Sequence, residues 1–209
     1  MSLRRGLLCA LGLLLAAGAT PAAIADPGPA RGTFLLATAQ VTHPMWHRTV
    51  ILLLEHGSDG TLGVILNRPL PLTASELVPE LPGLRPRELR VYLGGPVARH
   101  GLLWLLRSPR LPEGAGEVVD GVGYGGDPQL LIERLLGGGE ELEVRLFLGH
   151  AGWAQGQLQA EIERGDWRVL PADAGSIFDL DSDTQWESLM DRRRLRWVVR
   201  PPWLPVTPG

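Results

Sequence analysis

The sequence predicts a single mixed α and β domain in which strands dominate the first half. From Gly32 onward, short apolar runs alternate with turn signals and a few helical patterns, and no repeat or low-complexity linker separates them. The 209 residues, less a predicted leader of 25, are also a suitable length for one domain with one sizeable core. We therefore expect one α+β domain.

Apolar runs predict the strands of the first half. Residues 34–37, 49–54 and 61–66 are such runs, and Asp59-Gly60 between the second and third is a strong hairpin signal. Residues 90–93 and 102–106 predict a further pair of strands around a Gly-Gly-Pro turn. Several of these runs are apolar without alternation, which predicts strands that are covered on both faces.

Helical signals appear in the second half. Asp127-Pro128 opens a predicted helix, because aspartate caps free amides and proline fits the first helical position, and Gly137 ends it. Residues 142–148 predict a strand, so the glycine-rich stretch after it is expected at a strand-to-helix junction. The next helix is indicated by the following four-residue apolar spacing and by a stop glycine: Ala154, Leu158, Ile162 and Gly165. Residues 167–170 predict a strand, and residues 184–190 a last helix.

The N-terminus has the layout of a secretory signal peptide. Arg4 and Arg5 precede an uncharged apolar run, and small residues stand before a predicted cut after Ala25. The run is too short for the roughly 20 residues of a spanning helix, so we expect no transmembrane span in the mature chain. The predicted organisation is a signal peptide (1–25), a linker (26–31), the domain (32–191) and a basic extension rich in proline and tryptophan (192–209). We expect a periplasmic or secreted protein, or a cytoplasmic one if translation starts near Gly32.

Composition excludes several chemistries. Cys9 is the only cysteine and lies in the predicted leader, so the mature chain would have no disulfide, thiolate nucleophile or cysteine metal ligand. The chain contains no lysine, which excludes Schiff-base chemistry and a Walker-loop lysine. Cleavage would leave 18 arginines against 23 acidic residues, a formal charge of −5. Export and an acidic chain both argue against nucleic acid as a partner.

Five ordered sequence blocks resemble one bacterial family. They are GTFLLATAQVTHPMWHRTVILLLEH, GTLGVILNRP, VYLGGPV, FLGHAGWAQGQLQAEIERGDWRVLPAD and IFDLDSDTQWESLM, and together they span residues 32–190. In this order they closely resemble the YqgE/AlgH family. The resemblance implies a compact α+β domain with a bent, partly barrel-like sheet, and members are named as regulators of transcription or alginate production without agreed catalytic residues.

This sequence departs from the family pattern at several places. His150 stands where the family block has tyrosine, and Trp46 replaces the usual phenylalanine. Residues 192–209 extend the end, and the predicted export signal is unlike the family's usual cytoplasmic setting. The export signal argues against a DNA-related role for this member.

The glycines of the fourth block have two interpretations. Gly149, Gly152 and Gly156 would admit a ligand, and free amides at the start of the next helix would favour an anion. The alternative is a tight structural junction with Trp153 packed into the core. We therefore name as candidate ligand-binding residues Glu55, Asn67, Gly149, His150, Gly152, Trp153 and Gln157.

Polar residues at strand ends extend this candidate site. Glu55 and Asn67 end the two hairpin strands and form a plausible polar pair, although Asn67-Arg68-Pro69 is equally a structural turn. The histidines lack metal-binding spacing, so no metal or cofactor is expected. The aspartates of residues 179–183 lack the glycine and glutamate of a calcium loop and fit helix capping better.

The C-terminal segment RRRLRWVVR is basic and contains one tryptophan. Our interpretation is a solvated strand with Leu195, Trp197 and Val199 turned inward, and the alternative is contact with anionic lipid headgroups or a partner.

For function we expect a non-catalytic, exported domain that binds a protein or a small anionic ligand. The alternatives are a hydrolase-like enzyme on an acidic or phosphorylated substrate, with Glu55 or His150 as general base, and a cytoplasmic regulator of transcription.

Overall fold

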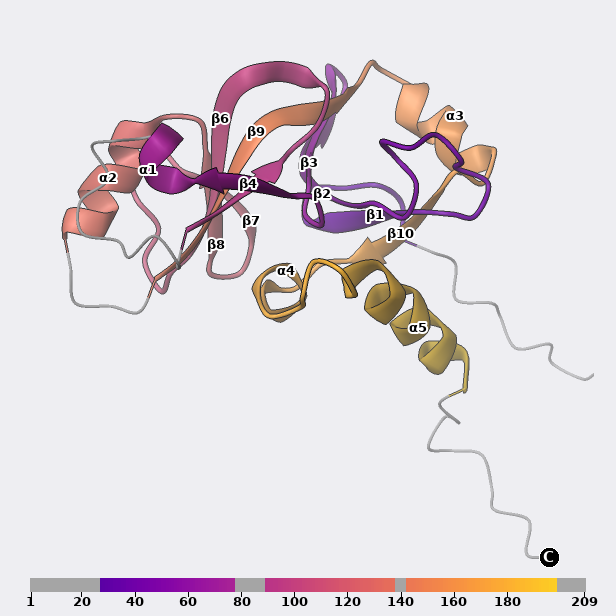
Figure 1. The fold of residues 1–209 in the computed structure, drawn as a ribbon. Coiled ribbons are helices and arrows are strands. Elements are labelled where there is room, and N and C mark those ends of the chain that lie inside the picture. Colours follow the sequence, from indigo (N-terminus) through magenta and orange to yellow (C-terminus); the bar gives the residue numbers. More distant parts are fainter. Residues whose placement is uncertain (1–26, 78–88, 138–141, 199–209) are drawn as a thin grey trace, which may run out of the picture.

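A computed structural model describes residues 27–77, 89–137 and 142–198, with only the backbone described for residues 193–198. The predicted signal peptide therefore lies outside the described residues, as does the segment after Val198. The described strands form one ten-stranded sheet that is not closed (Figure 1), with the main order β10-β1-β2-β3-β9-β6-β8-β7. The predicted α+β class is confirmed.

The strands on this path are β1 (Thr33–Ala37), β2 (Val50–Gly57), β3 (Gly60–Ile65), β6 (Val97–Arg107), β7 (Gly116–Val119), β8 (Val122–Gly125), β9 (Glu143–Trp153) and β10 (Trp167–Pro171). Off this path, β4 (Pro69–Thr73) pairs with β5 (Arg90–Leu93), which runs parallel to β9. The other described pairs are antiparallel. The helices are α1 (Ala74–Leu77), α2 (Pro128–Leu136), α3 (Gln157–Glu163), α4 (Ala174–Phe178) and α5 (Gln185–Val198).

Apolar clusters cover both faces of β1 and β2, as their continuous apolar runs predicted. Successive side chains of a strand point to opposite faces. Accordingly Phe34 and Leu36 belong to one buried cluster, whereas Leu35 and Ala37 belong to another. The first cluster includes side chains of α4 and α5, and the second includes Leu158 of α3. Figure 1 shows α3 on one side of this part of the sheet and α4 and α5 on the other.

The sheet is bent. A Cβ placed at Gly32, just before β1, would lie only 2.5 Å from the carbonyl oxygen of Val118 in β7. The β7 edge therefore comes close to the start of β1, although these strands stand far apart in the pairing order. A third apolar cluster, which includes Trp104 and Leu131, packs α2 against β5, β6 and β9. Asp127 caps α2 by accepting a hydrogen bond of 2.9 Å from the Gln129 amide, as predicted.

The glycine-rich stretch leads from a strand to a helix, as predicted, but the strand is longer than predicted. β9 continues to Trp153, so residues 154–156 alone connect it to α3. The strand leaves β6 and then pairs with β3, where Trp153 lies opposite Thr61. This second partner pairs with residues 151–153 and keeps them extended, whereas Gly149 before them has a φ of +70°. Helix α3 consequently begins at Gln157, and Ala154 lies outside it.

The basic segment is also different from the prediction. Residues 192–198 continue helix α5 and do not form a strand. No proline or glycine interrupts residues 185–198, so the helix that begins beside the apolar cluster extends into the basic residues. Val199, expected on the inward face of that strand, lies outside the described residues.

One further contact ties the end of the described chain to its beginning. The Trp186 indole Nε1 in α5 donates a 2.9 Å hydrogen bond to the carbonyl oxygen of Ala37 in β1. Among the described residues, no helix is long and apolar enough to cross a membrane.

Candidate functional site

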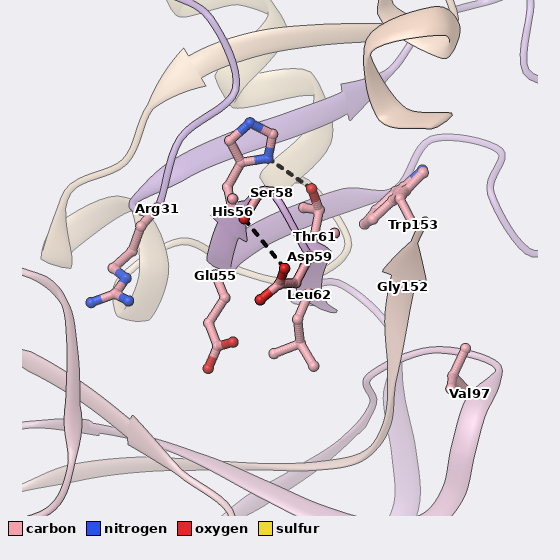
Figure 2. A pocket seen from close by; sticks show the side chains of 12 residues that line it. Arg31, Glu55, His56, Ser58, Asp59, Thr61, Leu62, Val97, Gly152 and Trp153 are labelled. Carbon is pink, nitrogen blue, oxygen red and sulfur yellow. Dashed lines mark hydrogen bonds between the residues drawn. The ribbon is translucent and has the colours of Figure 1, made fainter. Parts of the chain in front are cut away.

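The tip of the β2–β3 hairpin forms one wall of an open groove with a volume of about 580 Å³. We call it the hairpin groove, and it is lined by residues 55–62, Arg31, Val97, Gly152 and Trp153. In Figure 2 Arg31 lies on one side of the hairpin residues and Trp153 on the other. The groove therefore joins four parts of the chain that the sheet brings together: the segment before β1, the hairpin, the start of β6 and the end of β9.

A β-bulge positions Glu55. The register of β2 against β3 shifts between Leu53 and Glu55, so the strand carries one residue more than its partner there. Bulges of this kind re-aim side chains at the ends of strands. The Glu55 carboxylate accepts a hydrogen bond of 3.0 Å from the Tyr124 hydroxyl of β8, and Glu55 itself remains exposed to solvent.

The remaining polar groups of the hairpin form short-range contacts. His56 Nδ1 lies 2.7 Å from the Thr61 hydroxyl directly across the hairpin. Ser58 donates to the Asp59 carboxylate at 3.3 Å. With histidine neutral, the charged side chains of the groove are Arg31, Glu55 and Asp59, which leaves one net negative charge.

Burial raises the pKa of the Tyr124 phenol, and its hydrogen bond to Glu55 and the negative charge of Glu55 raise it further. The phenol therefore stays protonated over the physiological range. It acts as a hydrogen-bond donor that holds the Glu55 carboxylate in place.

A second, smaller pocket of about 220 Å³ adjoins the groove at Gly152 and Trp153. We call it the tryptophan pocket, and its lining is Val41, Trp46, Gly152, Trp153, Gln157, Glu161, Arg164, Asp166 and Trp167. The ring of Trp167 meets those of Trp46 and Trp153 edge to face, with centroids 6.2 and 6.1 Å apart. Three indoles from different elements thus surround one pocket.

The Glu161 carboxylate organises the tryptophan pocket. Its Oε2 accepts hydrogen bonds of 2.8 Å from the indole Nε1 of both Trp153 and Trp167. Its Oε1 accepts one of 3.0 Å from the Gln157 amide, one turn earlier on α3. Indole N–H groups are donors only, so one carboxylate satisfies both rings and fixes their orientation.

The candidate residues fall into three groups. Glu55, Gly152 and Trp153 line the hairpin groove, and Gln157 joins the last two in the tryptophan pocket. His150 is half-buried opposite Val97 and lies near Gly152, but it lines neither of the two pockets.

Gly149 and Asn67 lie elsewhere and have structural contacts. Gly149 has a φ of +70°, and a Cβ there would lie 2.6 Å from the carbonyl oxygen of Gly95. The Asn67 amide accepts from the Val50 amide at 2.9 Å and donates to the carbonyl oxygen of Arg48 at 2.8 Å. These bonds hold the start of β2, which favours the structural-turn interpretation of Asn67.

Sequence reasoning missed several lining residues. Arg31 was assigned to a linker, and Trp46 and Trp167 come from segments far from the glycine block in the sequence. The four-residue spacing of Gln157 and Glu161 on a helix was the one local signal for their contact.

The charges of the two pockets also differ from the expectation of an anionic ligand. Glu161 and Asp166 stand against Arg164 in the tryptophan pocket, so it too carries one net negative charge. The Ala154 amide before α3 is already bonded to Gln157 Oε1 at 3.1 Å. Among the described residues, no group of three histidine, cysteine, aspartate or glutamate side chains gathers as a metal-ligand set.

The sequence is similar to a known protein family over most of its length. The model of DUF179, described as AlgH-like, matches residues 34–197. A UPF0301 protein of Chlorobaculum tepidum is 36% identical over 156 residues, which cover 74% of this chain and 82% of that protein. A UPF0301 protein of Mycobacterium avium is 36% identical over 172 residues, with coverage of 78% and 83%.

Two solved structures have a similar fold. The solution structure of the AlgH protein from Pseudomonas aeruginosa superposes with a TM-score of 0.65 at 27% identity, covering 83% of this chain and 95% of that one. The crystal structure of protein DIP2367 from Corynebacterium diphtheriae gives a TM-score of 0.68 at 26% identity, covering 87% and 93%. This chain belongs to the AlgH-like family, as its five sequence blocks predicted.

Proposed function

We propose that this protein is a non-catalytic, exported domain that binds a small polar ligand in the hairpin groove. The observation that carries the proposal is the position of Gly152. This residue lines both pockets, and a Cβ built on it would meet no atom closer than 3.8 Å. Its backbone does not have the positive φ that requires glycine. Neither backbone strain nor crowding explains why glycine stands at position 152. A requirement for space beside a bound ligand does explain it.

The solvation of the groove supports binding over catalysis. The reacting groups of an enzyme site are commonly enclosed so that water is excluded. Glu55, His56 and Asp59 are instead exposed to solvent. Such groups are well suited to hydrogen bonding and to charge complementarity with a ligand, and the groove's net negative charge favours a ligand that carries a positive group.

The test is Gly152→Val compared with Gly152→Ala. Small polar molecules of opposite charge, the cation of ethanolamine and the anion of inorganic phosphate, are titrated into ¹⁵N-labelled protein while amide chemical shifts are recorded. We expect saturable shifts at residues 55–62 and 152–153, a loss of about tenfold or more in affinity for Gly152→Val, and a urea midpoint no lower than that of wild type for both variants. If Gly152→Val unfolds the domain, the tight-junction interpretation is correct and the proposal fails.

Export is tested separately by the intact mass and compartment of the protein made from its full reading frame in the native host. A periplasmic species cut after Ala25 supports the proposal and makes a direct role in transcription untenable. A full-length cytoplasmic species contradicts export and restores the regulatory alternative.

The enzymatic alternative retains one supporting observation, which is the placement of Glu55 in the groove beside Tyr124. As a general base, Glu55 would need a substrate proton within hydrogen-bond reach. If Glu55→Gln and His150→Ala both leave the pH profile of any detected hydrolysis unchanged, this alternative is removed.

A further inference from the structure

The tryptophan pocket has a chemistry distinct from that of the hairpin groove. Trp153 and Trp167 are nearly buried, whereas Trp46 on the loop before β2 is half-buried and borders solvent. The ring planes of Trp46 and Trp153 stand at 84° and 85° to that of Trp167. All three rings line the pocket, so part of each ring faces the space in which a ligand would lie.

The electrostatics of the pocket favour a positive charge. The face of an indole ring is negative and attracts cations, and tryptophan is the strongest aromatic partner for them. Both buried indoles donate their N–H groups to the Glu161 carboxylate, which makes their rings more electron-rich. Asp166 adds a second carboxylate, and Arg164 is held by it at 2.6 Å. One net negative charge therefore stands beside three aromatic rings.

The size of the pocket limits the ligand. A volume of about 220 Å³ is below the range of roughly 300–1,000 Å³ that is typical of drug-sized ligands. The three donors of a primary ammonium would need three acceptors, but the Glu161 carboxylate already accepts three hydrogen bonds, which leaves it about one acceptor site. A cation that carries methyl groups needs no such acceptors and presents apolar surface to the rings.

We propose that the tryptophan pocket binds a small, freely diffusing organic cation of the alkylated-ammonium class. Trp46, Trp153 and Trp167 contact its methyl groups, and Glu161 balances its charge through the polarised indoles. This site goes beyond the hairpin groove and does not depend on the function proposed for it, because its ligand contacts are the three rings.

The experiment compares choline with 3,3-dimethyl-1-butanol, a neutral molecule of nearly the same shape. Each is titrated into ¹⁵N-labelled protein while the indole N–H resonances are followed, with Trp153 and Trp167 assigned by single Trp→Phe variants. We expect choline to shift these two resonances saturably, and the alcohol to bind about tenfold more weakly or worse, since only the charged molecule gains the cation–π attraction. Equal binding of the two molecules, or no saturable shift with choline, would overturn the proposal.

Three variants assign the effect to the pocket. Glu161→Gln removes the charge at nearly constant shape, and Trp46→Leu removes one ring from the solvent border. Each should weaken choline binding by about tenfold. Glu163→Gln is the matched control, because Glu163 lies on the same helix but is exposed and bonded to Gln159. Should Glu161→Gln fail to fold, Trp46→Leu still decides the matter.

The source of the cation is tested with phosphatidylcholine vesicles. Binding of free choline with no further effect of vesicles supports a diffusing ligand. Binding to vesicles without binding of free choline contradicts the proposal and assigns the pocket to a lipid surface.

Discussion

Gly149 and Gly152 stand three residues apart in one strand, yet alanine is expected to have opposite effects at the two positions. Gly149 has φ +70°, and a Cβ there would lie 2.6 and 2.8 Å from the carbonyl oxygens of Gly95 and Val97. A left-handed conformation costs a non-glycine residue about 1–2 kcal/mol, and overpacking adds about 1–3 kcal/mol. Gly149→Ala should therefore lower the free energy of unfolding by about 2–5 kcal/mol.

Gly152→Ala should leave stability unchanged or raise it. The nearest atoms to its Cβ, at 3.8 Å, belong to His150 and Val97, which is an ordinary contact distance. Replacing glycine where the backbone permits alanine stabilises by about 0.4–1 kcal/mol, because the unfolded chain loses conformational freedom. The glycine block is thus expected to combine one structural glycine with one that keeps a pocket wall open.

Urea unfolding followed by tryptophan fluorescence measures both variants. With a slope of about 2 kcal/mol per molar urea, Gly149→Ala should lower the midpoint by about 1–2.5 M, and Gly152→Ala should not lower it. Equal losses in the two variants, or a larger loss for Gly152→Ala, would refute this division of roles.

Three smaller predictions concern single contacts. Asn67→Ala removes two hydrogen bonds from the loop before β2 and should cost about 1–3 kcal/mol in thermal or urea unfolding, while an unchanged midpoint would contradict its structural role. Tyr124→Phe removes the hydrogen bond to the Glu55 carboxylate and should cost about 1–2 kcal/mol of unfolding free energy at pH 7. Because the pKa of the phenol is raised in the folded protein, the wild type alone should lose this stability as the pH rises above about 10. If the variant showed the same loss at alkaline pH, the contact would be excluded. Asp173 caps α4. Burial acts to raise the pKa of its carboxyl, but hydrogen bonds from Ser176 outweigh burial and lower this pKa. The stability that the carboxylate contributes is therefore present above the pKa of the unfolded chain and is lost as the pH falls below about 4. Asp173→Asn keeps a cap but not the charge, so it should be less stable than wild type at pH 7, and the difference should shrink between pH 4 and 2; urea titrations at several pH values would check this.

Several elements could be predicted from short stretches of sequence alone. The apolar runs of β1, β2 and β3 and the capped start of α2 predicted those elements because their residues decide the backbone conformation locally. The extension of β9 was not predictable in this way. Glycines are typical of a turn, and residues 151–153 are extended because they pair with β3, a strand some 90 residues earlier. Short strands such as β7 and β8, rich in glycine, also depend on their partners.

The candidate site shows the same limit. Glu55 and Trp153 could be predicted as candidate residues because polar and aromatic side chains near strand ends are common in binding sites, and both line the hairpin groove. The association of Trp46 with Glu161 was not found, because it depends on a loop and a helix that meet only in the folded sheet. The different surroundings of Gly149 and Gly152 could not be predicted either, since the difference lies in a backbone angle and in the space around each Cβ.

The position of β1 determines when this domain is complete during synthesis. β1 lies between β2 and β10, and its end accepts the Trp186 hydrogen bond from a residue 149 positions later. A ribosome adds about 5–20 residues per second, so β10 is synthesised several seconds to tens of seconds after β1. Until then, the edge of β1 that pairs with β10 stays unpaired. During that interval the nascent chain presents a largely apolar strand with one unpaired edge, which is the kind of surface that chaperones engage.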